Sequence, residues 1–273
     1  MSKVQQRIRT IEEEKVGASS KRVLLVEGVD DVYAITAFLN KRYREWEKYW
    51  VLSEAGNKSM VLQMLSECPN WLGIVDRDEW RQEVIKRQQC EQPNLWVLPR
   101  FCIENYLIVP NELWSALPFK QQEKIAGGIT VLETKLLNNL EQWVAHGVLW
   151  SVINPLWEGL RSKGFKEALL APDVALNEEK IKATLQEWHD YLEPEKLWDI
   201  FQTRHVEVKK LSTEEQLKRW VHGKHFYARV VNPALNNLLG IKSADDRKKA
   251  IFSTCSVSDD LDGLWKKMRL TNE

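Results

Sequence analysis

Short β-rich apolar runs alternate with amphipathic segments over the first 110 residues. Four segments have the pattern of strands: RVLLV (22–26), YWVLSEAG (49–56), WLGIVD (71–76) and NLWVLP (94–99). Apolar residues recur at helical spacing in the three segments between them, 32–39, 57–65 and 79–88. The order β-α-β-α-β-α-β with short connections predicts an α/β fold with an open, mainly parallel sheet layered by helices.

After Pro110 the strand signals mostly stop and helical periods take over. A helix is expected to begin at Asn177, and the capping box Ser212-Thr-Glu-Glu215 predicts the start of another. The change in period divides the chain into three parts: an N-terminal extension (1–20), an α/β domain (21–110) and a mostly helical C-terminal region (111–273).

Composition narrows the class of protein. The 273 residues are 44% hydrophobic and 29% charged, which excludes a largely disordered chain. No apolar run approaches the roughly eighteen residues of a membrane span, and the first twenty residues lack the apolar core of a secretory signal. The four cysteines form no C-x-x-C pair, as expected of free thiols in a reducing compartment. We therefore expect a cytoplasmic protein without a membrane partner.

Charge is balanced overall but not along the chain. Lys plus Arg and Asp plus Glu both total 39. Residues 200–273 carry 14 basic and 9 acidic residues, and residues 111–199 carry the reverse. This polarity allows a phosphate-facing surface near the C-terminus, although ordinary mixed surface charge explains it equally simply.

Acidic residues follow two of the expected core strands. Glu27 comes directly after RVLLV, and Asp76 and Asp78 come after WLGIV. Ligands bind outside the carboxyl ends of parallel strands, and carboxylates at i and i+2 share one side of an extended chain. We therefore expect these three carboxylates to converge on Mg²⁺ or Mn²⁺, ions that stabilise charge on a phosphodiester during hydrolysis. The alternative is that acids are simply common at turns and helix N-caps.

The combination of VLLVEGVDD with LGIVDRD about fifty residues later resembles the TOPRIM domain of topoisomerases, bacterial primases and OLD-family nucleases. That motif has a Glu after the first strand and D-x-D after a later one, and the resemblance covers about residues 21–110. E-G-x-x-D (Glu27, Gly28, Asp31), the turn at 56–58 and LPRFCIENYL are similar to the DUF4435 branch of OLD-like TOPRIM proteins, which includes the nuclease effector of PARIS-type anti-phage systems. In those relatives the TOPRIM acids bind divalent metal for phosphodiester cleavage, and the partner is a separate ABC-type ATPase.

The resemblance implies that Glu27 is a metal ligand and general base or acid, with Asp76 and Asp78 as further ligands. Asp31 falls on the acid of the E-G-x-x-D motif and is expected to hold a second cation. Glu104 follows the fourth strand on the same side of the sheet and can complete the cluster. Asp31 and Glu104 have an equally ordinary alternative as acids in the first turn of a helix.

Basic residues are candidates for contact with phosphate. Lys58 lies in a strand-to-helix turn and Arg100 follows the fourth strand, so both are expected to bind substrate. Lys224 in the HGKH segment is the second candidate catalytic residue, since the resemblance implies that it stabilises the pentacovalent phosphate or the leaving oxyanion. For both lysines the alternative is a solvated side chain, and for Arg77 we favour a structural ion pair.

The sequence therefore predicts a divalent-metal-dependent nuclease, a hydrolase acting on DNA or on structured RNA such as tRNA. The resemblance adds an anti-phage defence effector controlled by a partner ATPase, with a homodimer possible. No G-x-x-x-x-G-K-[ST] motif occurs, so an ATPase of the P-loop type must act in trans. The rival interpretation is a non-catalytic TOPRIM-fold subunit whose Trp-rich helical half docks onto the ATPase.

Overall fold

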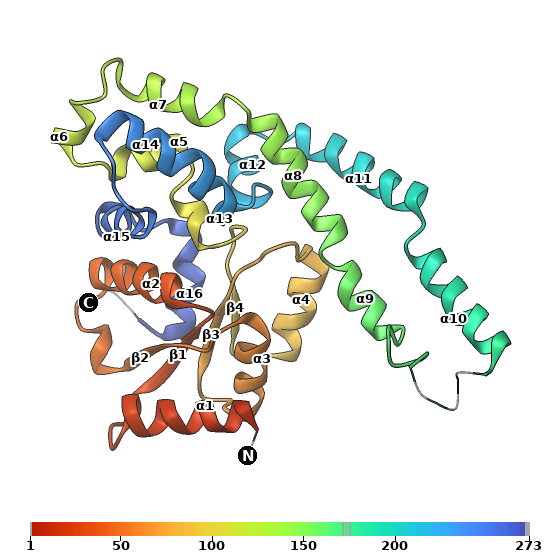
Figure 1. Ribbon diagram of the computed structural model, residues 1–273. Coiled ribbons are helices and arrows are strands. Elements are labelled where there is room, and N and C mark those ends of the chain that lie inside the picture. The colour runs from red at the N-terminus through yellow and green to blue at the C-terminus, as the bar shows by residue number, and fades with distance from the viewer. Residues whose placement is uncertain (1, 171, 173, 175, 271–273) are drawn as a thin grey trace.

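Four parallel strands form a single sheet in the computed structural model, which describes residues 2–170, 172, 174 and 176–270. In the sheet order β2-β1-β3-β4 (Figure 1), the strands are β2 (Trp50–Glu54), β1 (Arg22–Val26), β3 (Leu72–Val75) and β4 (Leu95–Val97). All three pairings are parallel. The predicted α/β class with a mainly parallel sheet is thus confirmed, and the strands lie within the predicted segments.

Helices cover both faces of the sheet. Leu24 and Val26 point into a core formed with α2 (Val29–Arg42), α15 (Ala244–Thr254) and α16 (Asp262–Met268). Val23 and Leu25 point the other way, against α1 (Lys3–Ile11), α3 (Lys58–Glu67) and α4 (Gln82–Glu91). Successive side chains of a strand alternate between its faces, so a run that is apolar throughout requires cover on both.

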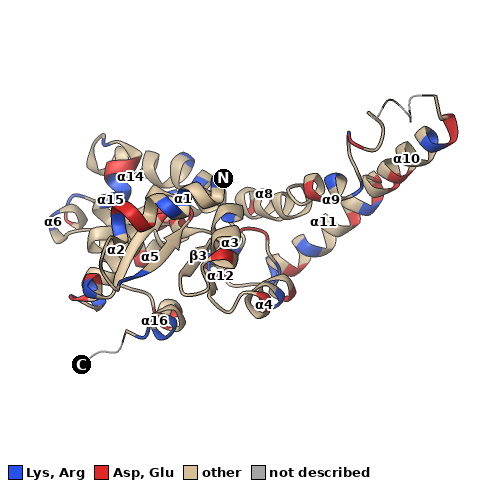
Figure 2. Ribbon diagram, turned by 90° about the horizontal axis from the view of Figure 1, so that it is seen from below, with Lys and Arg blue, Asp and Glu red and all other residues tan. Residues whose placement is uncertain are grey.

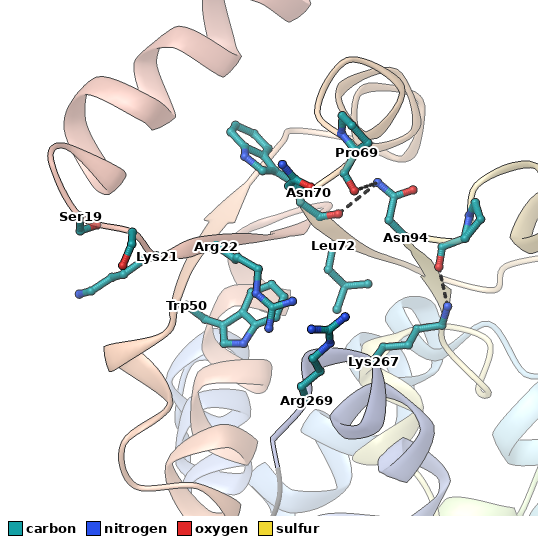
Figure 3. A pocket seen from close by; sticks show the side chains of 13 residues that line it. Ser19, Lys21, Arg22, Trp50, Pro69, Asn70, Leu72, Asn94, Lys267 and Arg269 are labelled. Atoms are coloured by element: carbon teal, nitrogen blue, oxygen red, sulfur yellow. Dashed lines mark hydrogen bonds between the residues drawn. The ribbon is translucent and has the colours of Figure 1, made fainter.

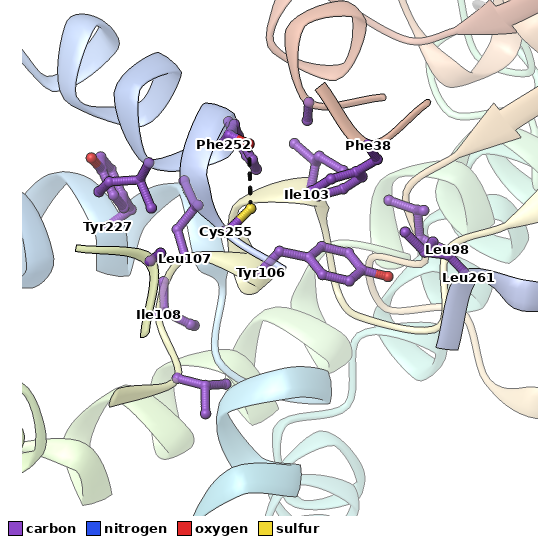
Figure 4. Packing of buried hydrophobic residues seen from close by; sticks show 14 of the residues in the cluster. Phe38, Leu98, Ile103, Tyr106, Leu107, Ile108, Tyr227, Phe252, Cys255 and Leu261 are labelled. Atoms are coloured by element: carbon purple, nitrogen blue, oxygen red, sulfur yellow. Dashed lines mark hydrogen bonds between the residues drawn. The ribbon is translucent and has the colours of Figure 1, made fainter. Parts of the chain in front are cut away.

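The expected domain boundary does not interrupt the core. The Phe38 ring lies 5.7 Å from that of Tyr106 and 5.9 Å from that of Phe252, so residues of both expected parts share one cluster (Figure 4). The N-terminal extension also packs on the sheet, because α1 buries Val4 and Ile8. The change of period near Pro110 therefore marks a change of secondary structure within a continuous core.

The remaining helices build the region beyond residue 110. They are α5 (Pro110–Ala116), α6 (Phe119–Gln122), α7 (Gly128–Leu137), α8 (Leu140–Ile153), α9 (Leu156–Ser162), α10 (Glu178–Tyr191), α11 (Pro194–Lys209), α12 (Thr213–Arg219), α13 (Gly223–Phe226) and α14 (Asn232–Leu239). The helices expected after Asn177 and Ser212 are present, and both residues accept the expected capping hydrogen bond.

Helices α8 to α11 form an arm that extends away from the sheet (Figures 1 and 2). Helix α8 packs along α11, and the Arg204 guanidinium donates to the backbone and hydroxyl oxygens of Ser151 at 2.7 and 2.9 Å. The base of the arm approaches the body closely at Gly147, where a Cβ atom would lie 1.6 Å from the carbonyl oxygen of Trp220. Only glycine fits at this contact.

Candidate active site

The strand order places a topological switch point between β1 and β3. The chain leaves β1 for β2 on one side and later returns to add β3 on the other, so the loops after β1 and β3 open a crevice at their carboxyl ends. Glu27 follows β1 and Asp76 follows β3. A carboxylate oxygen of Glu27 accepts a hydrogen bond from the backbone N–H of Asp76 at 2.8 Å. Two of the predicted acids are therefore adjacent at this crevice.

Two further predicted acids are buried beside them. Asp31, in the first turn of α2, accepts from the backbone N–H of Gly28 at 2.8 Å and is 7% exposed. Glu104 lies in a short 3-10 helix, η3 (Ile103–Tyr106), and is 2% exposed. Its Oε2 has no hydrogen-bond partner among the described residues, and its Oε1 lies 4.0 Å from Lys248 Nζ. The site thus holds buried carboxylate oxygens that protein donors do not fully satisfy.

Lys224 reaches this site from the C-terminal helical region. Its Nζ lies 3.2 Å from Oδ2 of Asp76, although 148 positions separate the two residues. Helix α13 approaches η3 closely at Gly223, where a Cβ atom would lie 2.2 Å from Oδ1 of Asn105. The Asn105 amide also donates to the carbonyl oxygens of Leu217 and Val221 at 2.7 and 2.9 Å. These contacts fix the HGKH segment against the carboxylates.

Asp78 follows a different path from the one expected. Its φ of 49° is left-handed, so the chain turns after β3 and the extended arrangement assumed for Asp76 and Asp78 is wrong. Oδ2 of Asp78 accepts from Lys58 Nζ at 2.6 Å, and Lys58 also lies 4.4 Å over the Trp80 ring. Lys58 therefore borders the acidic crevice, where the Asp78 carboxylate holds it, and its predicted contact with substrate stays a prediction.

Burial dominates the electrostatics of the site. It raises the pKa of Asp31 to about 7 and that of Asp76 well above its ordinary value, while neighbouring carboxylates add to both shifts. Burial also raises the pKa of Glu27, which Lys58 partly offsets. Burial by itself lowers the pKa of Lys224, but Asp76 and Glu104 outweigh it and raise that pKa overall. Added positive charge would lower these raised pKa values, so the cluster favours a bound cation.

The chemistry of these side chains fits a hard divalent cation, since every donor is a carboxylate oxygen and one buried oxygen lacks a partner. The arrangement, however, differs from the predicted common ligand set. Within the described part of the chain, no three His, Cys, Asp or Glu side chains are placed to hold one ion. The amino groups of Lys58 and Lys224 contact the acids instead. Binding an ion here requires these ammonium groups to give up their contacts.

Arg100 is the one predicted substrate contact that the structure overturns. It is 1% exposed, and its guanidinium bonds Glu112 at 2.5 and 2.9 Å and Asp260 at 2.9 Å. It also stacks 4.0 Å from the Tyr106 ring. Because its donors are occupied within the core, Arg100 joins η3 to the C-terminal helices and does not face a ligand.

A cleft with several arginines adjoins Asp78 and was missed in the sequence. The cavity, of about 290 Å³, lies between the start of α4 and the base of the arm, and its basic lining consists of Arg77, Arg81, Arg204 and Arg219. Within the described part of the chain, none of the four lies within ion-pair distance of a carboxylate, so the ion pair favoured for Arg77 is absent. Burial and then Arg219 lower the pKa of Arg77, and Nε of Arg204 is buried without a partner. The same lining includes four acidic residues, Asp78, Glu79, Glu83 and Glu207, so the cleft offers unpaired guanidinium groups without a net positive charge.

Three histidines lie on the side of the site that faces the arm. The rings of His222 and His225 stack 4.1 Å apart, and the His146 ring is 5.6 Å from that of His225. Burial lowers the pKa of His222 to about 4, with His225 contributing, while Asp78 offsets part of the shift. Burial also lowers the pKa of His146 and of His225. All three are therefore neutral at pH 7.

Comparison with known proteins finds no matching family model, no matching curated protein and no matching solved structure. Among the described residues, no helix combines the length and apolar character needed to cross a membrane. The function is therefore argued from the site itself.

Proposed function

We propose that the protein is a divalent-metal-dependent phosphodiesterase that cleaves nucleic acid at the carboxyl end of its sheet. The observation that carries the proposal is the gathering of Glu27, Asp31, Asp76, Asp78 and Glu104 around the β1–β3 switch point. Burial and neighbouring carboxylates raise the pKa of Asp31 and of Asp76 there, an arrangement that costs stability and is typical of functional sites.

The residues divide into three roles: metal ligands, a general base or acid, and a positive charge for the transition state. Once Lys58 and Lys224 release Asp78 and Asp76, the five carboxylates Glu27, Asp31, Asp76, Asp78 and Glu104 would supply oxygen ligands for Mg²⁺ or Mn²⁺. The ion, when bound, neutralises phosphate charge and lowers the pKa of an attacking water. Glu27 lies between β1 and β3 with its pKa raised by burial, as a general base or acid requires. Lys224, released from Asp76, supplies a positive charge for the transition-state phosphate or the leaving oxygen.

The arginine cleft supports a nucleic-acid substrate. It shares Asp78 with the carboxylate cluster, so a phosphate backbone held by Arg77, Arg81 and Arg219 would continue directly into the acidic crevice. Guanidinium groups without carboxylate partners match phosphate in charge and in geometry. The described lining also includes Trp80, Trp220 and Gln82, and the proposal covers DNA and structured RNA such as tRNA alike.

The finer assignment rests on the motif resemblance. We propose a TOPRIM nuclease of the OLD-like, DUF4435 branch, acting in the cytoplasm as an anti-phage effector under the control of an ABC-type ATPase. The order of Glu27, Asp31 and the Asp76–Asp78 pair along a parallel sheet supports it.

The second candidate is a non-catalytic subunit that docks onto such an ATPase. The arm favours it, because Ile153, Trp157, Leu185 and Trp198 are about half exposed on α8 to α11. Partner binding without cleavage, once the complex is active, would support this role alone.

The deciding experiment incubates the full chain, alone and with its ATPase, with plasmid, single-stranded DNA and total tRNA, each with Mg²⁺, Mn²⁺ or EDTA. Cleavage should require metal and fall at least about 100-fold in Glu27→Gln, while Glu179→Gln, an exposed acid on the arm, should behave as wild type. As an independent readout, Mn²⁺ should raise the melting temperature of wild type and not of Asp76→Asn. Metal-independent cleavage, or an equal loss of cleavage in Glu27→Gln and in Glu179→Gln, would contradict the proposal.

A further inference from the structure

A basic pocket lies at the amino end of the sheet, opposite the carboxylates. The cavity, of about 690 Å³, opens where residues 19–22 enter β1 and residues 69–72 enter β3, and the end of α16 closes one side (Figure 3). Its charged lining residues are Lys21, Arg22, Lys267 and Arg269, and among the residues that the structure describes no Asp or Glu lines it. A pocket with four cationic side chains and no acid attracts anions.

Arg22 is held in place at the centre of this pocket. Its guanidinium stacks 4.1 Å from the Trp50 ring and donates to the carbonyl oxygen of Met268 at 2.9 Å. Burial lowers the pKa of Arg22, and the nearby charge of Arg269 lowers it further. Two guanidinium groups therefore face one cavity and repel each other, a cost that a bound dianion or phosphodiester would relieve.

The four cations are available for a ligand. Within the described part of the chain, none of them lies within ion-pair distance of a carboxylate. Lys267 donates to the carbonyl oxygen of Pro93, which fixes its position without neutralising its charge. Arg269 is exposed in a left-handed conformation with φ of 57° after the last turn of α16. The positive charges of these four side chains are therefore not neutralised by any described carboxylate at the surface of the pocket.

The basic lining continues beyond this pocket. A second cavity of about 630 Å³ shares Ser20, Arg22, Trp50 and Arg269 with the first, so the two form one groove. The second adds Arg44, together with Arg42 and Lys48, which are paired with Asp262 and Glu45. A single phosphate group would fill a small part of such a groove, whereas a strand of nucleic acid presents phosphates along its whole length.

We propose that this groove binds the phosphate backbone of a nucleic-acid strand, as a site separate from the carboxylates. The contacts are to phosphate, so the site increases affinity without selecting sequence. The five-residue strand β1 separates the two ends of the sheet by roughly 15 Å, so one folded nucleic acid is long enough to touch both. Binding at the groove does not depend on the proposed cleavage.

The test measures binding of a fluorescent 12-nucleotide single-stranded RNA to the full chain by anisotropy in EDTA, where metal-dependent cleavage cannot occur. The Lys21→Gln/Arg269→Asn double variant removes two unpaired charges and keeps a residue suited to the left-handed position. Its affinity should fall about tenfold or more at 0.1 M salt. The matched control, Lys120→Gln/Lys124→Gln, removes two exposed lysines from the region of α6 and should bind as wild type.

Three outcomes would overturn the proposal: no binding by wild type, unchanged affinity in the double variant, or an equal loss in the control. Displacement of the RNA by pyrophosphate or a nucleoside monophosphate at the same phosphate concentration would assign the groove to a small ligand and also contradict it. A melting temperature equal to that of wild type shows that the double variant folds. If it does not fold, the single Lys21→Gln variant is measured in its place. Cleavage assays on the same variants separate a failure of this proposal from a failure of the proposed nuclease.

Discussion

The two ends of the sheet carry opposite charge, and they hold it in different ways. At the carboxyl end, Asp31, Asp76 and Glu104 are almost fully buried, and lysines from distant helices offset part of their charge. At the amino end, Arg22 is half-buried and Arg269 is exposed, and within the described part of the chain neither lies within ion-pair distance of a carboxylate. Buried carboxylates fix a few atoms in a small space, whereas exposed guanidinium groups spread charge over a long surface. The buried carboxylates are suited to catalysis, and the exposed guanidinium groups are suited to binding a nucleic-acid backbone.

The largest expected effect concerns Arg100, a positive charge at the carboxyl end that we assign to structure. Arg100→Met should lower the free energy of unfolding by about 3 kcal/mol, because Glu112 and Asp260 lose their partner while remaining partly exposed. Urea denaturation measures the change. Loss of RNA affinity without loss of stability would instead make Arg100 a ligand contact and weaken the contrast between the ends.

A substitution of Lys224 tests whether the positive charge that this lysine places beside Asp76 takes part in catalysis. Lys224→Met should lower the cleavage rate about 100-fold at saturating metal, since no other described side chain is within ion-pair distance of Asp76. The rate should recover partly in Lys224→Arg, which keeps the charge. A change confined to KM would show that the lysine binds substrate without stabilising the transition state.

The histidines make only the acidic end sensitive to mild acid. The folded-state pKa of His222 is about 4, below its ordinary value of 6.5, so the unfolded chain binds the extra proton and stability falls as pH drops from about 6.5 to 4. Between pH 7.5 and 5 the free energy of unfolding should fall by roughly 2 kcal/mol from this group. Asp31, with its pKa raised to about 7, contributes with the opposite sign in wild type and variant alike, so the measured quantity is the difference in free energy of unfolding between wild type and His222→Asn. In urea denaturation this difference should change by the same amount between pH 7.5 and 5, and a constant difference would refute the assignment.

The smallest expected effect is a change in the salt dependence of RNA affinity, which distinguishes the amino end of the sheet from the carboxyl end. The logarithm of RNA affinity should fall linearly with the logarithm of salt concentration, and Arg269→Asn should reduce that slope by about 1 because one phosphate contact is lost. Glu27→Gln should leave the slope measured in EDTA unchanged. A slope that responds only to the carboxylate variant would place the binding surface at the other end.

The sequence by itself determined the sheet and part of the acidic site. Strand periodicity is local, and parallel pairing brings all carboxyl ends to one edge, so Glu27 and Asp76 meet as predicted. The left-handed turn at Asp78 was not visible, because an aspartate tolerates both conformations and its backbone N–H bond to Phe101 comes from another loop.

Only the tertiary structure decided which positive charges meet which ligands. Arg22 begins its strand and Arg100 follows another, yet Arg100 is enclosed by Glu112 and Asp260 whereas Arg22 faces an open groove. The difference depends on how helices more than a hundred residues away pack against the sheet, as the bond from Arg22 to Met268 illustrates. Helical periodicity records which face of a helix is buried but not what it is buried against, so such pairings lie beyond the local pattern.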